Sequence, residues 1–277
     1  MATLTTLLLA LLATVFAVVL FSYTIAWYEY ANRDPSLIRR RFSPRALLSI
    51  SWTMAQETLL LTFTVLLHPF GWIRSRVRPE KSPSQPVLLL HGLFHNKACW
   101  LFARLVLRIQ GRTSLHTLNL PPWRDIETLT ESVAKRVDEI RHTQGVDKVA
   151  LVGHSMGGII ARNYLQQRGG ADKVSHLVLL GTPNTGSKLA PFALSPLGAH
   201  LQPGSDFLIR LAQAPLPEET VVTSIYSRLD NMVLPFESGS LEKAYNVELA
   251  GIGHISLLYH PRALAAVVRA LPGGAGS

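Results

Sequence analysis

One serine in this chain occupies a position from which a hydroxyl can act as a nucleophile. Ser155 is the centre of Gly-His-Ser-Met-Gly (153–157), with four apolar residues before it (149–152) and a helix-forming run after it (from Ile159). This order predicts a strand, a sharp turn and a helix, with the serine at the apex. Glycines at 153 and 157 remove the Cβ atoms that would collide in such a turn. The N-terminus of the following helix favours developing negative charge. The pattern also occurs by chance, so its catalytic partners must be found.

A serine hydroxyl needs a base to remove its proton and an acid to orient that base. Reactive groups of open α/β sheets gather after the carboxyl ends of strands. His254 lies in a glycine-rich loop between the last expected strand and the last expected helix, so we assign it as the general base. Asp230 follows the strand that ends at Tyr226 and is assigned as the orienting carboxylate. A turn-capping role is its ordinary alternative. The chain order is then Ser155, Asp230, His254.

The other histidines have simpler interpretations. His91 is expected to hydrogen-bond locally within its loop, and His154 to pack against its neighbours. His260 is the fallback base, with a surface position before Pro261 as its alternative. The remaining histidines lack a strand-end context and default to surface or structural roles: His68, His95, His116, His142, His176 and His200. Capping explains two further acids, Asp172 and Asp206.

The oxyanion that forms on attack needs two fixed donors, for which backbone N–H groups suffice. One is expected from Met156, at the start of the helix after the nucleophile. The other is expected from the loop after the first core strand, where His91-Gly92 allows a close approach. We assign it to Leu93, with the neighbouring Phe94 as the alternative.

Elements able to position these groups alternate along residues 87–277. Six short apolar runs predict strands, at 87–90, 114–120, 148–152, 174–180, 220–226 and 244–249. Between and after them we expect helices at 96–109, 159–167 and 256–271. A further helix is expected to open at the capping box Thr128-x-x-Glu131 and to end at Gly145. Such alternation predicts a mainly parallel, doubly wound sheet of about six strands. Residues 184–217 lack clean periodicity and are expected to form a cap with one helix near 206–212.

Composition points to a membrane segment beside this α/β domain. Of the 277 residues, 48% are hydrophobic and 16% are charged, and the formal net charge is +9. Residues 1–81 hold nine Lys/Arg and four acids, so much of the basic excess lies beside apolar segments. That placement favours lipid headgroup contact over nucleic-acid binding. The single cysteine, Cys99, excludes an internal disulfide framework and a Cys-rich zinc site.

The first apolar segment runs from Leu7 to Trp27 and is long enough to cross a membrane. A cleaved signal peptide is the alternative, but the leader has no Lys or Arg and the run exceeds a usual signal core. We therefore expect a retained anchor. The second segment, Ala46 to Leu67, contains Glu57, which is costly in lipid. It is expected to be a second crossing, an interfacial helix, or a helix docked on the globular domain.

Topology stays open at this point. One crossing would place the globular domain in the cytoplasm, and two would place it outside. Basic residues follow both segments, namely Arg33, Arg39, Arg40, Arg41 and Arg45 after the first, and Arg74, Arg76, Arg78 and Lys81 after the second. We expect a membrane-anchoring region at 1–78, a Pro/Ser linker at 79–86 and the α/β domain at 87–277.

Together these motifs resemble lipases and esterases of the α/β-hydrolase superfamily, most closely bacterial triacylglycerol lipases. His-Gly-Leu-Phe (91–94), Gly-His-Ser-Met-Gly-Gly (153–158), Gly-Thr-Pro-Asn-Thr-Gly-Ser (181–187) and the later acid and histidine fall in order over about residues 86–270. The resemblance implies the α/β-hydrolase fold, with Ser155, Asp230 and His254 catalytic and with Leu93 and Met156 as oxyanion donors.

Three departures accompany the resemblance. The usual two antiparallel strands before the first core strand are not apparent. Leu93-Phe94-His95 stands where some relatives have a glycine-rich oxyanion loop, and no acidic cluster suggests the calcium site of others. The N-terminal region lies outside the resemblance.

We therefore expect a membrane-anchored serine hydrolase that cleaves carboxylic esters with apolar acyl chains through an acyl-enzyme on Ser155. Its partners are a lipid or other ester substrate and a membrane, with no nucleic acid, no cofactor and no metal, and we expect a bacterial inner membrane. The cap leucines and phenylalanines are expected to grip the acyl chain, with core burial as the alternative: Leu189, Phe192, Leu194, Leu197, Leu201, Phe207, Leu208 and Leu211. Two other hypotheses are an acyltransferase or thioesterase on membrane-derived acyl groups, and a non-catalytic membrane-tethered binding module.

Overall fold

A computed structural model describes residues 2–33, 42–73 and 84–273 of the chain. Its centre is a six-stranded sheet in the order β2-β1-β3-β4-β5-β6, and every neighbouring pair is parallel. The strands are β1 (Val87–Leu90), β2 (Leu115–Leu118), β3 (Val149–His154), β4 (Val174–Leu180), β5 (Val221–Ser227) and β6 (Tyr245–Leu249). The expected mainly parallel, doubly wound sheet is thus confirmed.

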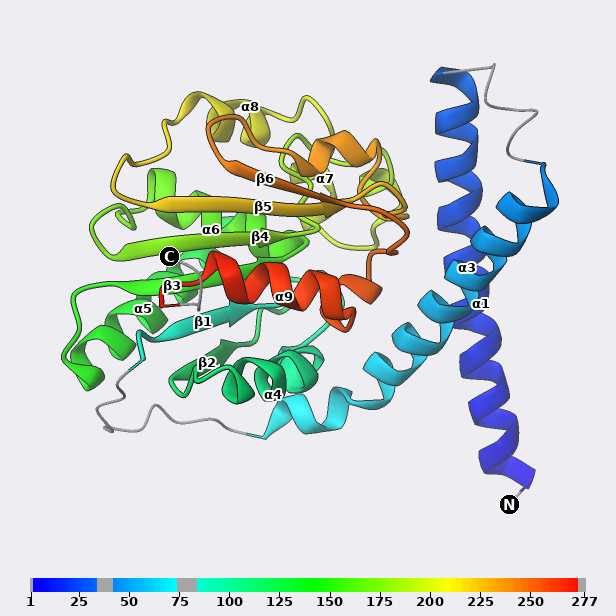
Figure 1. Ribbon diagram of the computed structural model, residues 1–277, viewed down its shortest axis with the longest axis horizontal. Helices are drawn as coiled ribbons and strands as arrows, with labels where there is room; N and C mark the ends of the chain where they lie inside the picture. The colour runs from blue at the N-terminus through cyan, green and yellow to red at the C-terminus, as the bar shows by residue number, and fades with distance from the viewer. Residues whose placement is uncertain (1, 34–41, 74–83, 274–277) are drawn as a thin grey trace.

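Helices cover both faces of this sheet (Figure 1). One face packs on α5 (Ile126–Gln144) and α6 (Met156–Gln167), with the cap helix α8 (Asp206–Gln213) joining the same apolar core. The other face packs on α4 (Leu101–Ile109) and α9 (Pro261–Ala270). The strand β1 is apolar and buried throughout, because both of its faces are covered.

Four expected helices have different boundaries. The helix expected at 159–167 begins at Met156, directly after Ser155. The helix expected from the Thr128 capping box begins at Ile126, because Asp125 is the N-cap and its carboxylate accepts the Thr128 N–H at 2.8 Å. The expected helix 256–271 is a short turn, η6 (Ser256–Leu258), followed by α9. This helix begins at Pro261, because proline is favoured at the first helical position. The expected helix 96–109 is likewise a short turn, η3 (Lys97–Trp100), followed by α4.

The cap contains η4 (Ala190–Phe192), α7 (Leu197–His200) and α8. Six of its apolar residues are buried, and these belong mostly to the cores rather than to an open surface: Leu189, Leu197, Leu201, Phe207, Leu208 and Leu211. Phe192 and Leu194 are exposed, and the Phe192 ring lies edge-on to Phe21 at 5.2 Å between ring centroids. Core burial therefore explains most of the residues that we expected to grip an acyl chain.

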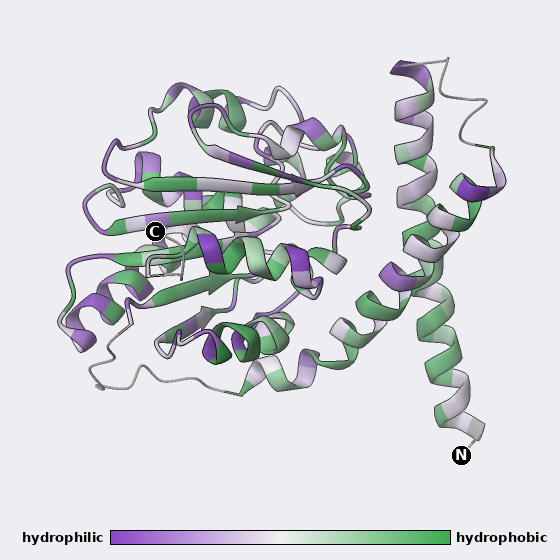
Figure 2. Ribbon diagram, in the orientation of Figure 1, coloured by the Kyte–Doolittle hydropathy of each residue, from purple (hydrophilic) through white to green (hydrophobic). Residues whose placement is uncertain are grey.

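Two N-terminal helices lie beside the carboxyl ends of the strands (Figure 1). They are α1 (Ala2–Arg33) and α3 (Pro44–Leu66), and a short turn, η2 (His68–Trp72), follows α3. Among the described residues, one helix is long and apolar enough to cross a membrane, at Thr3–Arg33. Figure 2 shows the apolar character of its N-terminal half. The arginine cluster at 39–41, the basic residues 74–81 and most of the expected linker lie outside the described residues.

Both helices contact the globular domain. From α1, Ser22 Oγ accepts Asn231 Nδ2–H at 2.7 Å, and the Tyr23 hydroxyl donates to the Leu229 carbonyl at 3.3 Å. From α3, the Thr64 and Tyr259 hydroxyls lie 2.7 Å apart. Glu57 is buried against the globular domain rather than facing outward. The contacts of Thr64 and Glu57 are those that we expect if the second apolar segment is a helix docked on the globular domain.

Candidate active site

Ser155 stands at the apex of the turn between β3 and α6. Its backbone has φ 54° and ψ −127°, in the positive-φ region that a residue with a side chain rarely adopts. Close packing around the turn requires glycines on both sides of it. A Cβ at Gly157 would lie 2.4 Å from the Leu90 carbonyl oxygen, and one at Gly153 would lie 2.4 Å from Gly158 Cα. The sequence-predicted strand, sharp turn and helix are all present.

Asp230 and His254 form a buried pair in the loops after β5 and β6. His254 Nδ1 donates to Asp230 Oδ2 at 2.8 Å. The other carboxylate oxygen, Oδ1, accepts the N–H groups of Met232 and Val233, both at 2.8 Å. Asp230 is thereby fixed in orientation and holds the Nδ1–H tautomer of His254, leaving Nε2 free to accept a proton.

The surroundings of His254 adjust its basicity. Burial by itself lowers the pKa of His254, but the charge and hydrogen bond of Asp230, together with the Glu57 charge, raise the pKa above its ordinary value. The ring of His154 lies 4.6 Å from that of His254 between centroids. Burial keeps the pKa of His154 well below its ordinary value, so this neighbour stays neutral and adds no competing positive charge.

Two glycine-containing loops lie against Ser155 and the Asp230–His254 pair. A Cβ at Gly92 would lie 3.0 Å from Ser155 Cβ, so the loop after β1 passes directly beside this serine. A Cβ at Gly181 would lie 3.3 Å from Asp230 Oδ2 and 3.4 Å from His254 Cε1. The Gly-Thr-Pro segment after β4 therefore leaves room for the Asp230 and His254 side chains. Within the described residues the Ser155 hydroxyl makes no hydrogen bond, as is common for catalytic groups without substrate.

The loop after β1 also has the geometry of a donor site. It turns tightly, with His95 N–H donating to the Gly92 carbonyl at 3.3 Å and with Phe94 at φ 58°. Positive φ is unfavourable for an aromatic residue and marks a constrained loop. In the part of the chain that the structure describes, neither Leu93 N–H nor Phe94 N–H donates to another protein group. Both candidates for the second oxyanion donor therefore stay available.

The remaining histidines have structural surroundings. His91 is buried, its Nδ1 donates to the Gly92 carbonyl at 2.8 Å, and its Nε2 accepts Leu120 N–H at 2.8 Å. This is the local bonding that we expected of it, and burial lowers its pKa to about 4. His260 caps α9, with Nδ1 accepting Arg262 N–H at 3.2 Å, so the fallback base has another role.

Sequence reasoning missed two residues at the His254 loop. Asn231 Oδ1 accepts the His254 N–H at 3.2 Å. Glu57, from α3, accepts the N–H groups of Ile255 and Ser256. A signal for Glu57 was present, because it is the single acid within the apolar stretch 46–67.

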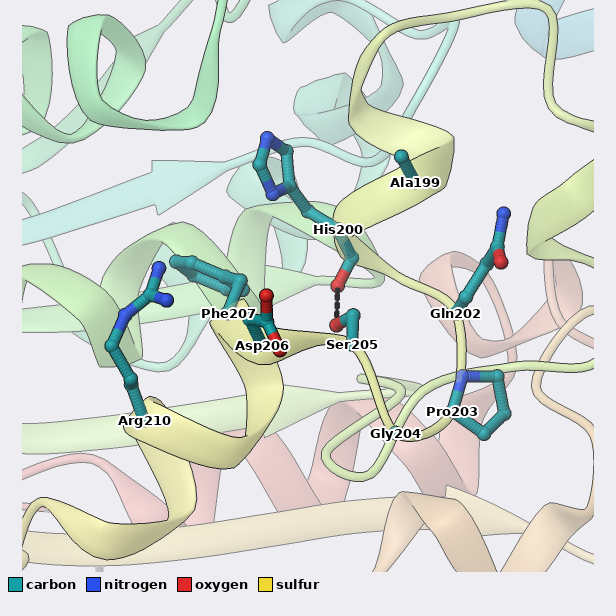
Figure 3. A pocket seen from close by; sticks show the side chains of 9 residues that line it. All are labelled: Ala199, His200, Gln202, Pro203, Gly204, Ser205, Asp206, Phe207 and Arg210. Carbon is teal, nitrogen blue, oxygen red and sulfur yellow. Dashed lines mark hydrogen bonds between the residues drawn. The ribbon is translucent and has the colours of Figure 1, made fainter.

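A separate hollow of about 520 Å³ lies in the cap (Figure 3). Its walls come from α7, α8 and the loop between them, and the Ser205 hydroxyl donates to the His200 carbonyl at 2.8 Å across one side. None of Ser155, Asp230 and His254 lines it. Across the described ranges, no group of three or more His, Cys, Asp or Glu side chains is arranged to hold a metal ion.

The family model of the alpha/beta hydrolase family matches residues 87–230, just over half of the chain. The chain belongs to the alpha/beta hydrolase family. Within this alpha/beta hydrolase, the matched range runs from the first residue of β1 to Asp230 and includes the serine turn.

Curated relatives match a shorter part of the hydrolase. The human (Lyso)-N-acylphosphatidylethanolamine lipase is 28% identical over 113 residues, which are 38% of this chain and 32% of that protein. The mouse protein of the same name is 27% identical over 113 residues, with the same coverage. The match thus spans about a third of the length of these relatives.

Solved structures share the fold of the hydrolase. The mature form of the Bacillus licheniformis lipase BlEst2 aligns with a TM-score of 0.56 at 20% identity, over 65% of this chain and 89% of that one. Aspergillus fumigatus lipase B aligns with a TM-score of 0.59 at 20% identity, over 70% of this chain and 54% of that one. The resemblance to lipase-like α/β-hydrolases that the sequence motifs indicated is confirmed at the level of the fold.

Proposed function

We propose that the protein is a membrane-anchored carboxylic ester hydrolase with Ser155 as its nucleophile. The observation that carries the proposal is the buried pair in which His254 Nδ1 lies 2.8 Å from Asp230 Oδ2. His154 Nε2 lies 3.2 Å from the His254 carbonyl oxygen, and the next residue, Ser155, is held at positive φ on a strand–turn–helix apex. The family membership and the lipases among the relatives support ester cleavage as the reaction.

In the proposed mechanism, His254 Nε2 removes the Ser155 proton as Oγ attacks the ester carbonyl. Asp230 holds the imidazolium that forms. The oxyanion accepts hydrogen bonds from Met156 N–H and from Leu93 or Phe94 N–H. His254 then protonates the departing alcohol, and water, activated by the same imidazole, releases the acid from the acyl-enzyme.

An apolar acyl chain fits the surroundings of this site. The strands point toward both N-terminal helices (Figure 1). Ser155, Asp230 and His254 follow the carboxyl ends of β3, β5 and β6, so the loops that carry them lie on the same side. Large apolar side chains cover the outer surfaces of α1 and α3: Leu7, Phe16, Leu20, Trp52, Leu59 and Phe63 are exposed. A lipid in the membrane that α1 enters would have its ester near this side of the domain.

The C-terminal half of α1 argues for a retained anchor. Glu29 pairs with Lys188, and the Tyr30 hydroxyl accepts the Phe236 N–H at 3.2 Å. These contacts would be lost if the segment were cleaved as a signal peptide. Residues 2–20 precede Phe21, whose ring contacts Phe192 of the globular domain. They extend about 29 Å as a helix, close to the hydrocarbon thickness of about 30 Å.

A second surface fits the same membrane. The outer face of α4 is apolar, with Leu101, Phe102, Leu105 and Ile109 exposed. It is linked to α3 through Tyr259, whose ring lies 6.0 Å from Phe102 and 6.1 Å from Phe63 between centroids. In Figure 1, α4 lies on the side of the domain toward which the N-terminal end of α1 projects, and Figure 2 shows strongly apolar residues on it beside its arginines. We propose that this face rests on the bilayer that α1 enters.

A series of p-nitrophenyl esters of increasing acyl length tests the proposal. The full chain in detergent is expected to release p-nitrophenol, and Ser155→Ala, Asp230→Asn and His254→Ala are expected to lose most of that release. An added alcohol or thiol acceptor distinguishes hydrolysis from acyl transfer. A folded wild-type protein without turnover, or a Ser155→Ala variant with full turnover, would refute it.

A further inference from the structure

One carboxylate of the N-terminal region bonds directly to the loop that carries His254. Glu57 lies in the middle of α3, and 1% of its surface is exposed. Its Oε2 accepts the N–H of Ile255 at 2.9 Å, and its Oε1 accepts the N–H of Ser256 at 2.7 Å. These two residues directly follow His254. Both oxygens are thus occupied by consecutive backbone donors of the loop that carries the candidate base.

The loop is shaped to receive this carboxylate. A Cβ at Gly253 would lie 2.3 Å from the carboxyl carbon of Glu57, so glycine is required for so close an approach. The His254 N–H is held separately by Asn231 Oδ1 at 3.2 Å. All three N–H groups from 254 to 256 therefore bond to side chains outside the loop, and two of the three bond to Glu57.

The charge of Glu57 also acts on the imidazole. Burial raises the pKa of Glu57, and its two backbone hydrogen bonds oppose that rise by favouring the carboxylate. The other titratable groups that interact with Glu57 or His254 are Asp230, His154, His95 and Tyr23. The two neighbouring histidines are buried and neutral, because burial lowers the pKa of each. A carboxylate here therefore stabilises a positive charge on His254.

We propose that Glu57 is a positioning residue of the active site, and that its carboxylate fixes the His254 loop against Asp230 and Ser155. This inference rests on the proposed hydrolase function. It gives α3 a part in turnover that a simple membrane tether would not have, because docking of α3 completes the loop that holds the base. A buried acid in an apolar helix is costly, and its two hydrogen bonds to the His254 loop offset that cost.

The test compares Glu57→Gln with Glu29→Gln in the full chain, using a short soluble ester. Gln keeps the volume at position 57, but its NH₂ group faces one of the two backbone donors. We expect kcat to fall about 10- to 100-fold, because small misplacements of a catalytic group have effects of this size, with KM nearly unchanged. Glu29 also lies in the N-terminal region, on α1, and Glu29→Gln breaks its ion pair with Lys188 of the globular domain. This variant is expected to keep the wild-type kcat.

The pH profile separates positioning from general stability. Without the Glu57 charge the pKa of His254 falls, so the acid limb of kcat/KM is expected to move to lower pH in Glu57→Gln. Glu29→Gln is expected to leave that limb in place. A loss of stability alone would lower the amount of active protein without moving the limb.

The outcomes are distinguishable from failure of the proposed function. An inactive, folded wild-type protein would refute hydrolysis itself. Active wild type together with a folded Glu57→Gln that has the wild-type kcat and acid limb would overturn the role of Glu57. If Glu57→Gln does not fold, Glu57→Asp replaces it, since it keeps the charge and shortens the reach. A lowered kcat with an unmoved acid limb then supports the role, and a wild-type kcat overturns it.

Discussion

At the scale of single residues, the candidate site depends on groups held in unusual states. Ser155 and Phe94 are two of the three non-glycine residues with positive φ in the described ranges, and both border the site. Asp230 and His254 are almost completely buried. A strained backbone and buried ionisable groups each lower the stability of a fold. Their occurrence at the same place is typical of a catalytic centre.

The first prediction concerns the protonation state of His254. Attack by Ser155 requires a neutral imidazole, and Asp230 and Glu57 raise the pKa of His254 above 6.5. We therefore expect kcat/KM to fall as the pH drops through that raised pKa, whereas it stays level above it. The measurement is a profile of kcat/KM from about pH 5 to about pH 9 with a soluble ester.

Asp230→Asn is the matched variant for this profile. It removes the negative charge and the acceptor that fixes the tautomer, so turnover is expected to fall by about 10⁴-fold and the acid limb to move to lower pH. A profile that is flat for the wild type, or unchanged in Asp230→Asn, would contradict the assignment of this pair.

At the scale of elements, the serine turn is held by the close approach of β1, β3 and α6. The second prediction is that Gly157→Ala destabilises the fold, because the new Cβ would lie 2.4 Å from the Leu90 carbonyl oxygen, a backbone atom that cannot easily move. Overpacking of this kind costs about 1–3 kcal/mol. Urea unfolding of the solubilised protein measures it.

Glu131→Ala, on the exposed side of α5, is the control for Gly157→Ala and is expected to unfold within about 0.5 kcal/mol of the wild type. Equal stability of Gly157→Ala and the wild type would mean that the turn is looser than described.

Sequence patterns predicted the elements of the sheet well, because a strand buried on both faces carries a continuous apolar run. Val87–Leu90 and Val174–Leu180 were predicted to the residue. Helix starts were harder. Thr128 has the spacing of a capping box, yet Asp125 is the N-cap, since several nearby polar residues can serve and only the local backbone selects one.

The contacts of α3 with the His254 loop were beyond the sequence patterns. They join residues about 200 positions apart, and no local periodicity encodes a tertiary contact. An acid in an apolar stretch is costly in lipid and equally costly in a dry protein interior, so composition alone did not choose between the alternatives for Glu57. The members of the candidate triad could be proposed from the sequence, because each of them follows a recognisable strand.

At the scale of the whole molecule, α4 lies on the side of the domain toward which the N-terminal end of α1 projects, and the strands point at α1 and α3 (Figure 1). If α1 is an anchor as proposed, the exposed apolar side chains of α4 face the same bilayer. The third prediction is that Ile109→Glu, at a side chain that is 73% exposed, weakens this seating. We expect a lower ratio of turnover on a long-chain ester in vesicles to turnover on a short soluble ester, because an acid opposes burial among lipid tails.

Tyr245→Glu is the control for Ile109→Glu, because Tyr245 is similarly exposed but lies at the start of β6, at the opposite edge of the sheet. Its ratio is expected to match that of the wild type. If both variants lower the ratio equally, or neither does, α4 does not rest on the bilayer.

The most direct test of the central claim is labelling of the full chain with a fluorophosphonate probe, followed by intact mass and peptide mapping. We predict one adduct, on Ser155, that is absent in Ser155→Ala and forms much more slowly in His254→Ala, because the imidazole activates the hydroxyl. Folded wild-type protein that takes up no probe, or that carries the adduct on another residue, would contradict the account.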